Sequence, residues 1–351
     1  MNIKSLKIIK VYPLPISIKM IKEMKVAFFS TQKYDREFFL RENDKFGFNL
    51  VFHESHLKEE TLGLAAGFKV ICVFVNDCIT ENMLIKLKEN GTELIALRCA
   101  GFNNIDIKAA QRLGIKIVRV PAYSPYAVAE HTLALILSLN RRIHKAYNRV
   151  RESNFCLDGL LGFDLYGKKA GIIGTGKIGK LVAKLLSSFG CEVYLYDAFP
   201  DKDFQIGTYT DLNTLLSSVD ILSLHCPLTP ETKHLISKET LELMNNGVMI
   251  INTSRGALIK AKDAIQGLKS GKIGYLGLDV YEEEENLFFE DHSNSIIQDD
   301  TLMRLISFPN VIITAHQAFF TQNAMRNIAV TTLMNIKDFQ EGKDLINIVG
   351  V

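Results

Sequence analysis

Short apolar runs alternate with segments of helical periodicity along most of this chain. In segments such as 79–90 the apolar positions recur every three or four residues, as on one face of a helix. The runs between such segments are rich in Val, Ile, Leu and Phe, and each has the length of a buried strand. The first five lie at 25–31, 49–54, 69–76, 93–100 and 116–121. A strand–helix–strand succession predicts a parallel sheet covered by helices on both faces.

A long helical segment separates this series from a second one. Two prolines in PAYSP (121–125) mark a junction. Residues 124–154 then lack Gly and carry their only Pro at 125, where a helix tolerates it after a Ser124 cap. We predict one long helix here. Its apolar face is broad, and its length favours a helix shared with a second subunit over a simple core helix, and hence a homodimer or higher homo-oligomer.

The second series predicts another parallel sheet. Its strands are expected near 170–173, 192–196, 220–225, 248–252, 274–279 and 311–315. A chain of 351 residues is long for one core, so two domains are expected.

Charge and hydropathy exclude several classes of protein. The net charge is +2, but the first 23 residues contribute +4, which leaves the remaining chain near −2. That balance does not suit a nucleic-acid partner. No run approaches the ~20 apolar residues of a membrane span. We therefore expect a soluble, cytoplasmic protein that acts on a small molecule, with no nucleic-acid or membrane partner.

Cysteine and histidine spacing gives no sign of a metal site. Six cysteines are scattered without a CxxC pair, which predicts reduced thiols. His53 and His56 form an HxxH pair without a third ligand, and we expect a surface pair.

The strongest local signal is a glycine-rich turn. Gly174, Gly176 and Gly179 follow the strand AGII and open the helical stretch KIGKLVAKLLSSFG. A second strand, EVYLY, ends at Asp197, 18 residues after Gly179. Glycine motifs often mark only tight turns, but this order of elements is the one a dinucleotide site requires. The free N–H groups of a helix N-terminus bind the pyrophosphate. An Asp at position 197 accepts hydrogen bonds from the ribose hydroxyls, so NAD is favoured over NADP.

Polar residues follow several strands of the second series. HCP (225–227), NTSRG (252–256), LDV (278–280) and TAH (314–316) all lie at predicted carboxyl ends, where open α/β sheets bind their ligands. Arg255 stands in one of these turns. A guanidinium there can hold a substrate carboxylate with two parallel hydrogen bonds, although a surface salt bridge is the commoner role of an arginine.

His316 lies at the end of the last predicted strand. Hydride transfer to a carbonyl leaves an alkoxide that needs a proton, and an imidazolium is the usual donor near neutral pH. A carboxylate partner would stabilise the charged ring and set its tautomer. The candidates are Glu282 to Glu285, among which spacing does not choose. The same run also fits a solvated loop.

Taken together, these motifs resemble the D-isomer-specific 2-hydroxyacid dehydrogenases, and among them most closely the fermentative D-lactate dehydrogenases. The similar stretches cover the chain from about Met24 to near its end and include RCAGFNNID (98–106), VPAYSPYAVAEHTLALILSLNRRIHKAY (120–147), IGTGKIGK (173–180), LHCPLTPE (224–231), NGVMIINTSRGALI (246–259) and LFFEDHSNSIIQDD (287–300). The resemblance implies an α/β fold of two Rossmann-like or flavodoxin-like domains with parallel sheets and a cleft between them. It also implies NADH-dependent reduction of pyruvate to D-lactate.

The resemblance assigns site residues as well. The family's catalytic set is an arginine, a glutamate 29 residues later and a histidine, which here are Arg255, Glu284 and His316. The residues implied for NAD are Gly174, Gly176, Lys177, Ile178, Gly179, Asp197, Cys226, Pro227, Thr232, Thr253, Ser254, Arg255 and Asp279. Those implied for the substrate are Cys99, Ala100, Gly101, Tyr123 and Phe319.

Some points depart from the family or stay open. Residues 1–23 have no counterpart, and Thr232 replaces an asparagine found in some members. We assign 24–121 with 317–351 to a substrate domain and 122–316 to an NAD domain. A dehydrogenase for a bulkier 2-oxo acid is one alternative. The other is a non-catalytic NAD-sensing protein like the transcriptional corepressors of this fold.

Overall fold

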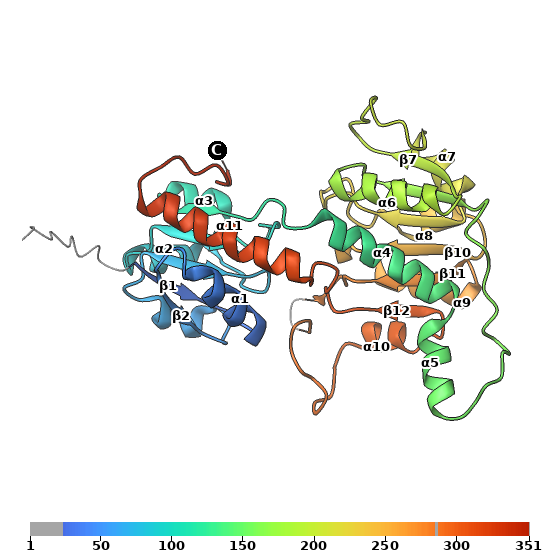
Figure 1. Cartoon of the computed structure of the whole chain (residues 1–351), viewed down its shortest axis with the longest axis horizontal. Coiled ribbons are helices and arrows are strands. Elements are labelled where there is room, and N and C mark those ends of the chain that lie inside the picture. The colour runs from blue at the N-terminus through green and yellow to red at the C-terminus, as the bar shows by residue number, and fades with distance from the viewer. Residues whose placement is uncertain (1–23, 285–286, 351) are drawn as a thin grey trace, which may run out of the picture.

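The computed structural model describes residues 24–284 and 287–350. The predicted extension at 1–23 and the candidate Glu285 lie outside them. The described chain forms two lobes, each built around its own parallel sheet (Figure 1). The predicted α/β class with two parallel sheets is confirmed.

The first lobe contains a five-stranded sheet of order β2-β1-β3-β4-β5, and all its paired strands are parallel. All five strands that the sequence predicts here are present. The elements are β1 (Lys25–Phe28), α1 (Lys33–Asn43), β2 (Asn49–Phe52), η1 (Glu59–Ala65), β3 (Val70–Val73), α2 (Glu81–Glu89), β4 (Leu94–Leu97), α3 (Ile107–Arg112) and β5 (Lys116–Val118).

The second lobe contains a seven-stranded parallel sheet of order β12-β11-β10-β9-β6-β7-β8. Strand β8 is not among the predicted strands, because a strand of two residues leaves no periodic pattern. The elements are α4 (Pro125–Asn140), α5 (Ile143–Arg151), β6 (Lys169–Ile173), α6 (Lys177–Ser188), β7 (Glu192–Tyr196), β8 (Thr208–Tyr209), α7 (Leu212–Ser218), β9 (Ile221–Leu224), α8 (Lys238–Leu243), β10 (Val248–Asn252), η2 (Gly256–Leu258), α9 (Ala261–Ser270), β11 (Ile273–Leu278), α10 (Asp300–Ile306) and β12 (Val311–Ile313).

The C-terminal helix returns to the first lobe. Helix α11 (Gln322–Gln340) packs against α1 and β4 and lies across that lobe in Figure 1. Ile348 then bridges to Val118 beside β5. The chain therefore passes between the lobes twice, once before α4 and once before α11. The domain limits predicted from the sequence, at 121/122 and 316/317, stay predictions.

The prediction of one long helix over 124–154 is wrong. The segment forms two helices, α4 and α5, because Arg142 adopts a left-handed backbone conformation with φ 49°. The Asn140 amide binds both backbone groups of Phe163, which holds a returning segment at the end of α4. Helix α4 packs against α6, β10 and β11, whereas α5 has no buried residue.

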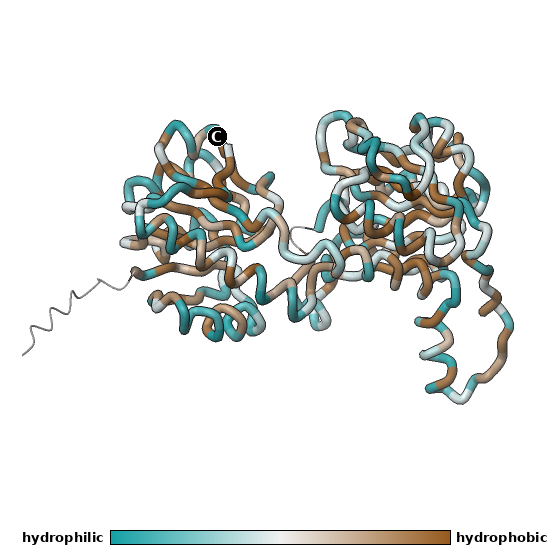
Figure 2. The backbone as a smooth tube through the Cα atoms, turned by 45° about the horizontal axis from the view of Figure 1, so that its top comes forward, coloured by the Kyte–Doolittle hydropathy of each residue, from teal (hydrophilic) through white to brown (hydrophobic). Residues whose placement is uncertain are grey.

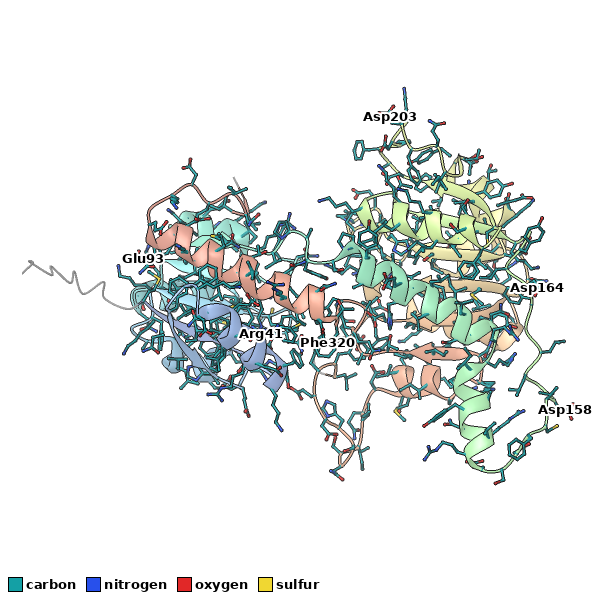
Figure 3. The ribbon with its side chains drawn as sticks, viewed as in Figure 1. Arg41, Glu93, Asp158, Asp164, Asp203 and Phe320 are labelled. Atoms are coloured by element: carbon teal, nitrogen blue, oxygen red, sulfur yellow. The ribbon has the colours of Figure 1, made fainter. Side chains whose placement is uncertain are left out.

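Helix α5 and the segment after it project from the second lobe as an arm (Figure 2). Figure 3 labels Asp158 on the projecting part and Asp164 where the chain comes back to the lobe. The strands of both sheets, by contrast, are mostly buried; β3, β4, β9 and β10 are buried at every position. Among the described residues, no helix has the length and apolar character needed to cross a membrane.

Candidate active site

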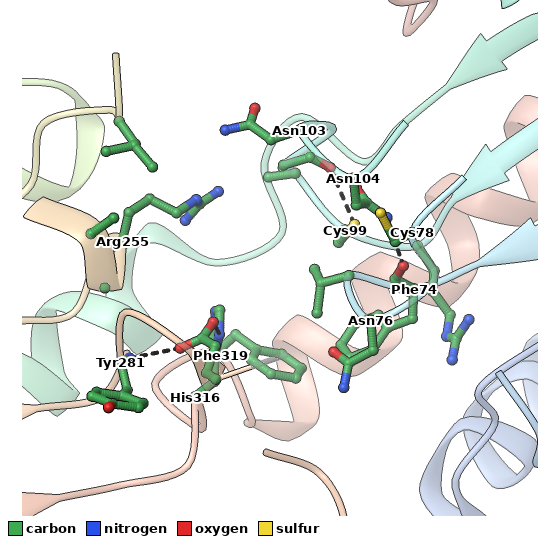
Figure 4. Close-up of a pocket in the computed structure, with 18 of the residues that line it drawn as sticks. Phe74, Asn76, Cys78, Cys99, Asn103, Asn104, Arg255, Tyr281, His316 and Phe319 are labelled. Atoms are coloured by element: carbon green, nitrogen blue, oxygen red, sulfur yellow. Dashed lines mark hydrogen bonds and ion pairs between the residues drawn. The ribbon is translucent and has the colours of Figure 1, made fainter. Parts of the chain in front are cut away.

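A cavity of about 240 Å³ lies where the lobes face each other. Residues from both lobes line it, so it exists only in the folded arrangement of the whole chain (Figure 4). Its walls include Phe74, Asn76, Cys99, Ala100, Gly101 and Tyr123 from the first lobe and the linking segment, and Arg255, Tyr281, Glu284, His316 and Phe319 from beyond β10.

His316 and Glu284 form an ion pair on one wall of this cavity. Nδ1 of His316 lies 2.8 Å from Oε1 of Glu284. The second carboxylate oxygen accepts a hydrogen bond of 2.8 Å from the N–H of Tyr281. Both side chains are about one-fifth exposed. This geometry orients the ring through Nδ1 and leaves Nε2 for a reacting molecule.

The backbone at His316 is also specialised. Its φ is 51°, a left-handed conformation that few side chains adopt. Its N–H donates to the carbonyl oxygen of Asp279 at 2.7 Å, which fixes the turn after β12 against the end of β11. The tertiary contacts therefore hold the histidine in a position that its local sequence would not select.

Arg255 extends into the same cavity from the turn after β10 (Figure 4). Its Nη1 donates to the carbonyl oxygen of Ser254 at 2.7 Å. The next residue must be glycine, because a Cβ on Gly256 would lie 2.0 Å from the carbonyl oxygen of Tyr281. A Cβ on Gly101, across the cleft, would lie 2.8 Å from Nη2 of Arg255. The guanidinium thus sits directly against the Cys99–Gly101 loop.

That loop follows β4 and is held from both sides. The thiol of Cys99 donates to the carbonyl oxygen of Gly101 at 3.3 Å, and Arg119 donates to that of Ala100 at 2.8 Å. Burial raises the pKa of Cys99 to about 12, against the opposing effect of Arg98 and Arg255. Cys99 is therefore a neutral, packed thiol at neutral pH and not a nucleophile.

Two aromatic residues complete the wall near His316. The rings of Tyr123 and Phe319 meet edge to face with centroids 6.0 Å apart, and Phe319 lies 6.5 Å from the imidazole ring. Burial raises the pKa of Tyr123 to about 12, although Arg255 opposes this. The hydroxyl of Tyr123 thus stays protonated and can donate a hydrogen bond. The structure places all five predicted substrate residues on this one cavity.

The glycine-rich turn has the space that a dinucleotide needs. A Cβ on Gly174 would lie 2.4 Å from the backbone nitrogen of Cys226, and one on Gly179 would lie 1.9 Å from the Gly174 carbonyl oxygen. No atom lies within 4 Å of the Cβ position of Gly176. The first and third glycines are therefore required by packing, while the second leaves open space at the N-terminus of α6 for a phosphate. Lys177 and Ile178 begin that helix.

Asp197 lies at the end of β7, next to this turn. Its Oδ2 accepts hydrogen bonds from the N–H and hydroxyl of Thr175 at 2.6 and 3.0 Å, and its Oδ1 accepts from the N–H of Phe199. Tyr209 on β8 donates to the Thr175 hydroxyl. Asp197 is only partly buried, so its carboxylate remains accessible to ribose hydroxyls. These residues fit NAD.

The remaining predicted cofactor residues lie on neighbouring strand ends. Ser254 donates to the carbonyl oxygen of Cys226 at 2.7 Å, and Thr232 donates to that of Pro227 at 2.7 Å. Thr253 shares a hydrogen bond of 2.9 Å with Thr132 of α4. The turns after β9 and β10 are thus joined side by side. Thr232 also accepts a hydrogen bond of 2.8 Å from the N–H of Thr229, so it has a local structural role in this turn.

Asp279 links the ends of β11 and β12. It accepts hydrogen bonds from the hydroxyl of Thr314 and from the N–H groups of Gln317 and Ala318 at 2.6–2.9 Å. Burial by itself would raise the pKa of Asp279. Hydrogen bonds from His131, Thr314 and Ala318 and the nearby His316 outweigh it, so this pKa lies below its ordinary value.

Sequence reasoning missed several residues of this region. His131 on α4 lies 3.0 Å from the Thr314 hydroxyl and 3.4 Å from Asp279. Phe74 and Asn76 line the cavity after β3. The signal was available for these two, because they follow a strand of the first sheet. No sequence signal marked His131.

The glutamate run divides its members between different partners. Glu284 binds His316, whereas Glu282 binds His234 at 2.5 Å and accepts from the N–H of Ala261. Glu283 is exposed. Of the glutamates in this run that the structure describes, Glu284 is the one that contacts His316, and it is the one that the resemblance indicated.

The prediction that His53 and His56 form a surface pair is wrong. The ring of His53 stacks on Phe29 with centroids 5.1 Å apart. His56 is only 21% exposed and contacts Ser30 and Glu290. The two histidines point to different partners.

Comparison with known proteins identifies the family. The model of the D-isomer specific 2-hydroxyacid dehydrogenase NAD-binding domain matches residues 133–318. The chain is 51% identical to D-lactate dehydrogenase of Escherichia coli (strain K12) over 326 residues, 92% of this chain and 99% of that protein. The apo-structure of D-lactate dehydrogenase from Escherichia coli superposes with a TM-score of 0.85 at 47% identity, over 93% of this chain and 100% of that one.

A third relative is D-lactate dehydrogenase from Aquifex aeolicus complexed with NAD and lactic acid. It superposes with a TM-score of 0.83 at 35% identity, over 92% of this chain and 98% of that one. The chain therefore belongs to the D-isomer specific 2-hydroxyacid dehydrogenase family. It is an NAD-dependent oxidoreductase, closely similar to D-lactate dehydrogenases. The alternative of a non-catalytic NAD sensor is not supported.

Proposed function

We propose that this protein is a D-lactate dehydrogenase that reduces pyruvate to D-lactate with NADH in a reversible reaction. The observation that carries the proposal is the meeting of Arg255 with the His316–Glu284 pair on one cavity. A 2-oxo acid has a carboxylate beside a carbonyl, and this site offers a cation and a proton donor in the same arrangement.

Each residue has a defined role in this proposal. Arg255 binds the substrate carboxylate with its guanidinium and polarises the neighbouring carbonyl. The backbone N–H groups of the Cys99–Gly101 loop share the carboxylate, with Tyr123 beside them. Bound NADH supplies the hydride. Nε2 of His316 donates a proton to the carbonyl oxygen as it becomes negative, and removes it in the reverse direction. Glu284 stabilises the charged ring.

The same proposal places NAD on the second lobe. The turn of Gly174–Gly179 with the start of α6 holds the pyrophosphate, and Asp197 binds the adenine ribose. Cys226, Pro227 and Thr232 line the adenine side. Thr253–Arg255 approach the nicotinamide ribose, and Asp279 faces the carboxamide. The lobes are then a substrate domain (24–121 with 317–351) and an NAD domain (122–316) whose cleft closes on the substrate.

The decisive experiment is NADH oxidation by the purified protein with pyruvate, followed by chiral analysis of the product. Rapid oxidation that yields D-lactate supports the proposal. A panel of 2-oxo acids with longer side chains, compared by kcat/KM, tests the substrate, because one methylene changes specificity by about 1–3 kcal/mol. A clear preference for phenylpyruvate or a branched 2-oxo acid would replace pyruvate in the proposal and keep the mechanism.

We also propose that the arm mediates a homodimer. Helix α5 exposes Ile143 (53%) and Tyr147 (61%). The segment after it exposes still larger fractions of four side chains, Phe155 (74%), Leu157 (80%), Leu161 (88%) and Tyr166 (83%). Apolar side chains clustered on a projecting element are typical of a surface covered by another subunit. The helix predicted for this role is broken, but its second half supplies part of the surface.

A further inference from the structure

The HxxH motif of His53 and His56 does not line the active-site cavity. One of its histidines, His56, nevertheless bridges the two lobes. Nδ1 of His56 is 2.6 Å from the hydroxyl of Ser30 at the end of β1. Nε2 of the same ring is 2.8 Å from Oε1 of Glu290. Glu290 lies in the segment that follows the catalytic loop of the other lobe, 234 residues away in sequence.

The hydrogen bonds that join Asp77, Ser30 and His56 indicate which nitrogen atoms of the His56 ring carry a proton. Asp77 is fully buried and accepts hydrogen bonds from the N–H groups of Leu57 and Phe74 and from the Ser30 hydroxyl at 2.6–2.8 Å. A carboxylate that accepts three hydrogen bonds is stabilised in its ionised form. Ser30 therefore gives its single proton to Asp77, and its oxygen accepts from Nδ1–H of His56.

The other ring nitrogen must also carry a proton. Glu290 is 44% exposed, and an ionised carboxylate accepts hydrogen bonds but donates none. A hydrogen bond from Nε2 to Glu290 needs Nε2–H. With both nitrogens donating, the geometry fits an imidazolium that bridges Ser30 and Glu290. A neutral ring that keeps Nδ1–H would turn a lone pair toward the carboxylate and be repelled.

The bridge is connected to the active site through the backbone next to Glu290. Gln32 and Asn76 of the first lobe donate to the carbonyl oxygens of Phe289 and Phe288 at 3.1 and 3.2 Å. The ring of Phe289 lies 5.2 Å from Phe74 and 5.8 Å from His316. Asn76 and Phe74 line the cavity (Figure 4).

The same segment reaches back to the catalytic glutamate. The N–H groups of Leu287 and Phe288 donate to the carbonyl oxygen of Glu284 at 3.0 Å. A displacement of residues 287–290 would therefore change the position of Glu284 through its backbone and the position of His316 through the ring of Phe289.

We propose that His56 and Glu290 form an interdomain latch that closes when His56 is protonated and holds the cleft in its closed, reactive arrangement. The latch weakens when His56 loses its proton at higher pH, because a neutral ring cannot donate to both Ser30 and Glu290. Reduction of a 2-oxo acid consumes a proton, so the latch favours closure under the same acidic conditions that favour reduction. This catalytic consequence rests on the proposed function, whereas the latch itself does not.

Other ionisable groups near the latch define its controls. His53, Glu54, Lys58 and Glu59 share its segment, and Glu59 is paired with Lys86 of α2. From the other lobe, His292 lies 3.7 Å from the second oxygen of Glu290. His292 also contacts Glu290 but belongs to the same segment of the same lobe, so it does not bridge the lobes. His292→Gln is therefore the matched control for His56→Gln.

Hydrogen–deuterium exchange of the full-length protein without substrate tests the latch directly. We expect peptides containing 287–292 and 53–58 to be at least five-fold better protected at pH 6 than at pH 8, after correction for intrinsic exchange rates. Glu290→Gln and His56→Gln should abolish that difference, and His292→Gln should retain it. Equal protection of the wild type at both pH values overturns the latch, as does loss of the difference in His292→Gln.

Kinetics then test the catalytic consequence separately. In the wild type, kcat/KM for the 2-oxo acid should fall more steeply from pH 6 to pH 8 than in Glu290→Gln, by about three-fold or more. NADH affinity should be equal in the two proteins. Identical pH profiles would show that the latch does not act on turnover. An inactive protein with pH-dependent exchange would reject the proposed function while leaving the latch in place.

Discussion

At the scale of single residues, His316 depends on two separate constraints. The hydrogen bond from Nδ1 to Glu284 orients the ring, and the hydrogen bond from its N–H to Asp279 holds a left-handed backbone. Glutamine preserves a hydrogen-bonding side chain of similar length but has no proton to transfer.

His316→Gln should lower kcat by about 10²–10⁴-fold, the usual contribution of general acid catalysis. NADH binding, measured by fluorescence titration, should change less than two-fold, because the dinucleotide turn is built from other elements. Loss of NADH binding would indicate that the histidine is structural.

Wild-type reduction should also decline as pH rises, because only the protonated imidazole can donate. A rate of NADH oxidation at saturating substrate that stays constant from pH 6 to pH 9 would contradict this role of His316. The Glu290→Gln background separates this effect from that of the interdomain latch.

Arg255→Lys should raise KM for the 2-oxo acid about 10–100-fold. A lysine offers a point charge in place of two parallel hydrogen bonds, and a hydrogen bond to a charged group contributes about 1.5–3 kcal/mol. Initial rates over a range of substrate concentrations give the answer. Arg112→Lys, in an exposed pair with Glu81, is the control and should leave KM unchanged. An unchanged KM in Arg255→Lys would remove the carboxylate clamp.

At the scale of elements, Asp279 joins β11, β12 and the start of the segment leading to α11. Its carboxylate gathers hydrogen bonds from Thr314, Gln317 and Ala318. Because the pKa of Asp279 is lower in the folded protein than its ordinary value, the ionised form stabilises the fold. That contribution is present above pH 4 and is lost as pH falls through the folded-state pKa.

Asp279→Asn should therefore lower the free energy of unfolding by about 1–3 kcal/mol at pH 7. Urea unfolding of the protein without cofactor should show the same deficit at pH 7 and pH 5, and a smaller one below about pH 4. A deficit that grows on acidification would mean that the carboxylate does not stabilise the fold through its charge.

At the scale of the whole molecule, the cleft lies between the two lobes and the arm is the surface that we propose for a second subunit. Leu157→Ser with Leu161→Ser removes two of the most exposed apolar side chains of the arm. We expect this double variant to be monomeric, or to dissociate at least ten-fold more readily, by light scattering after size-exclusion chromatography. Ile346→Ser changes an equally exposed side chain (89%) in the first lobe and should leave the oligomeric state unaltered. A wild type that is already monomeric would reject the arm as an interface.

The alternation of apolar runs and helical segments was enough to predict two parallel sheets and all eleven of their longer strands. Strand order, by contrast, comes from pairing between distant segments, and β8 was too short to show a pattern. The break between α4 and α5 was not visible either. It depends on the contact of Asn140 with Phe163 and on the left-handed Arg142, which no local periodicity encodes.

The same division holds for the site. Glycine spacing and the acidic residue after the second strand determined the dinucleotide turn by themselves, because every part of that unit lies within 24 consecutive residues. The choice of Glu284 rested on resemblance, and the partners of His56 and His131 came only from the fold. Those contacts join residues from different lobes or from distant elements of one lobe, so they form only when these elements pack together and leave no trace in the order of residues along the chain.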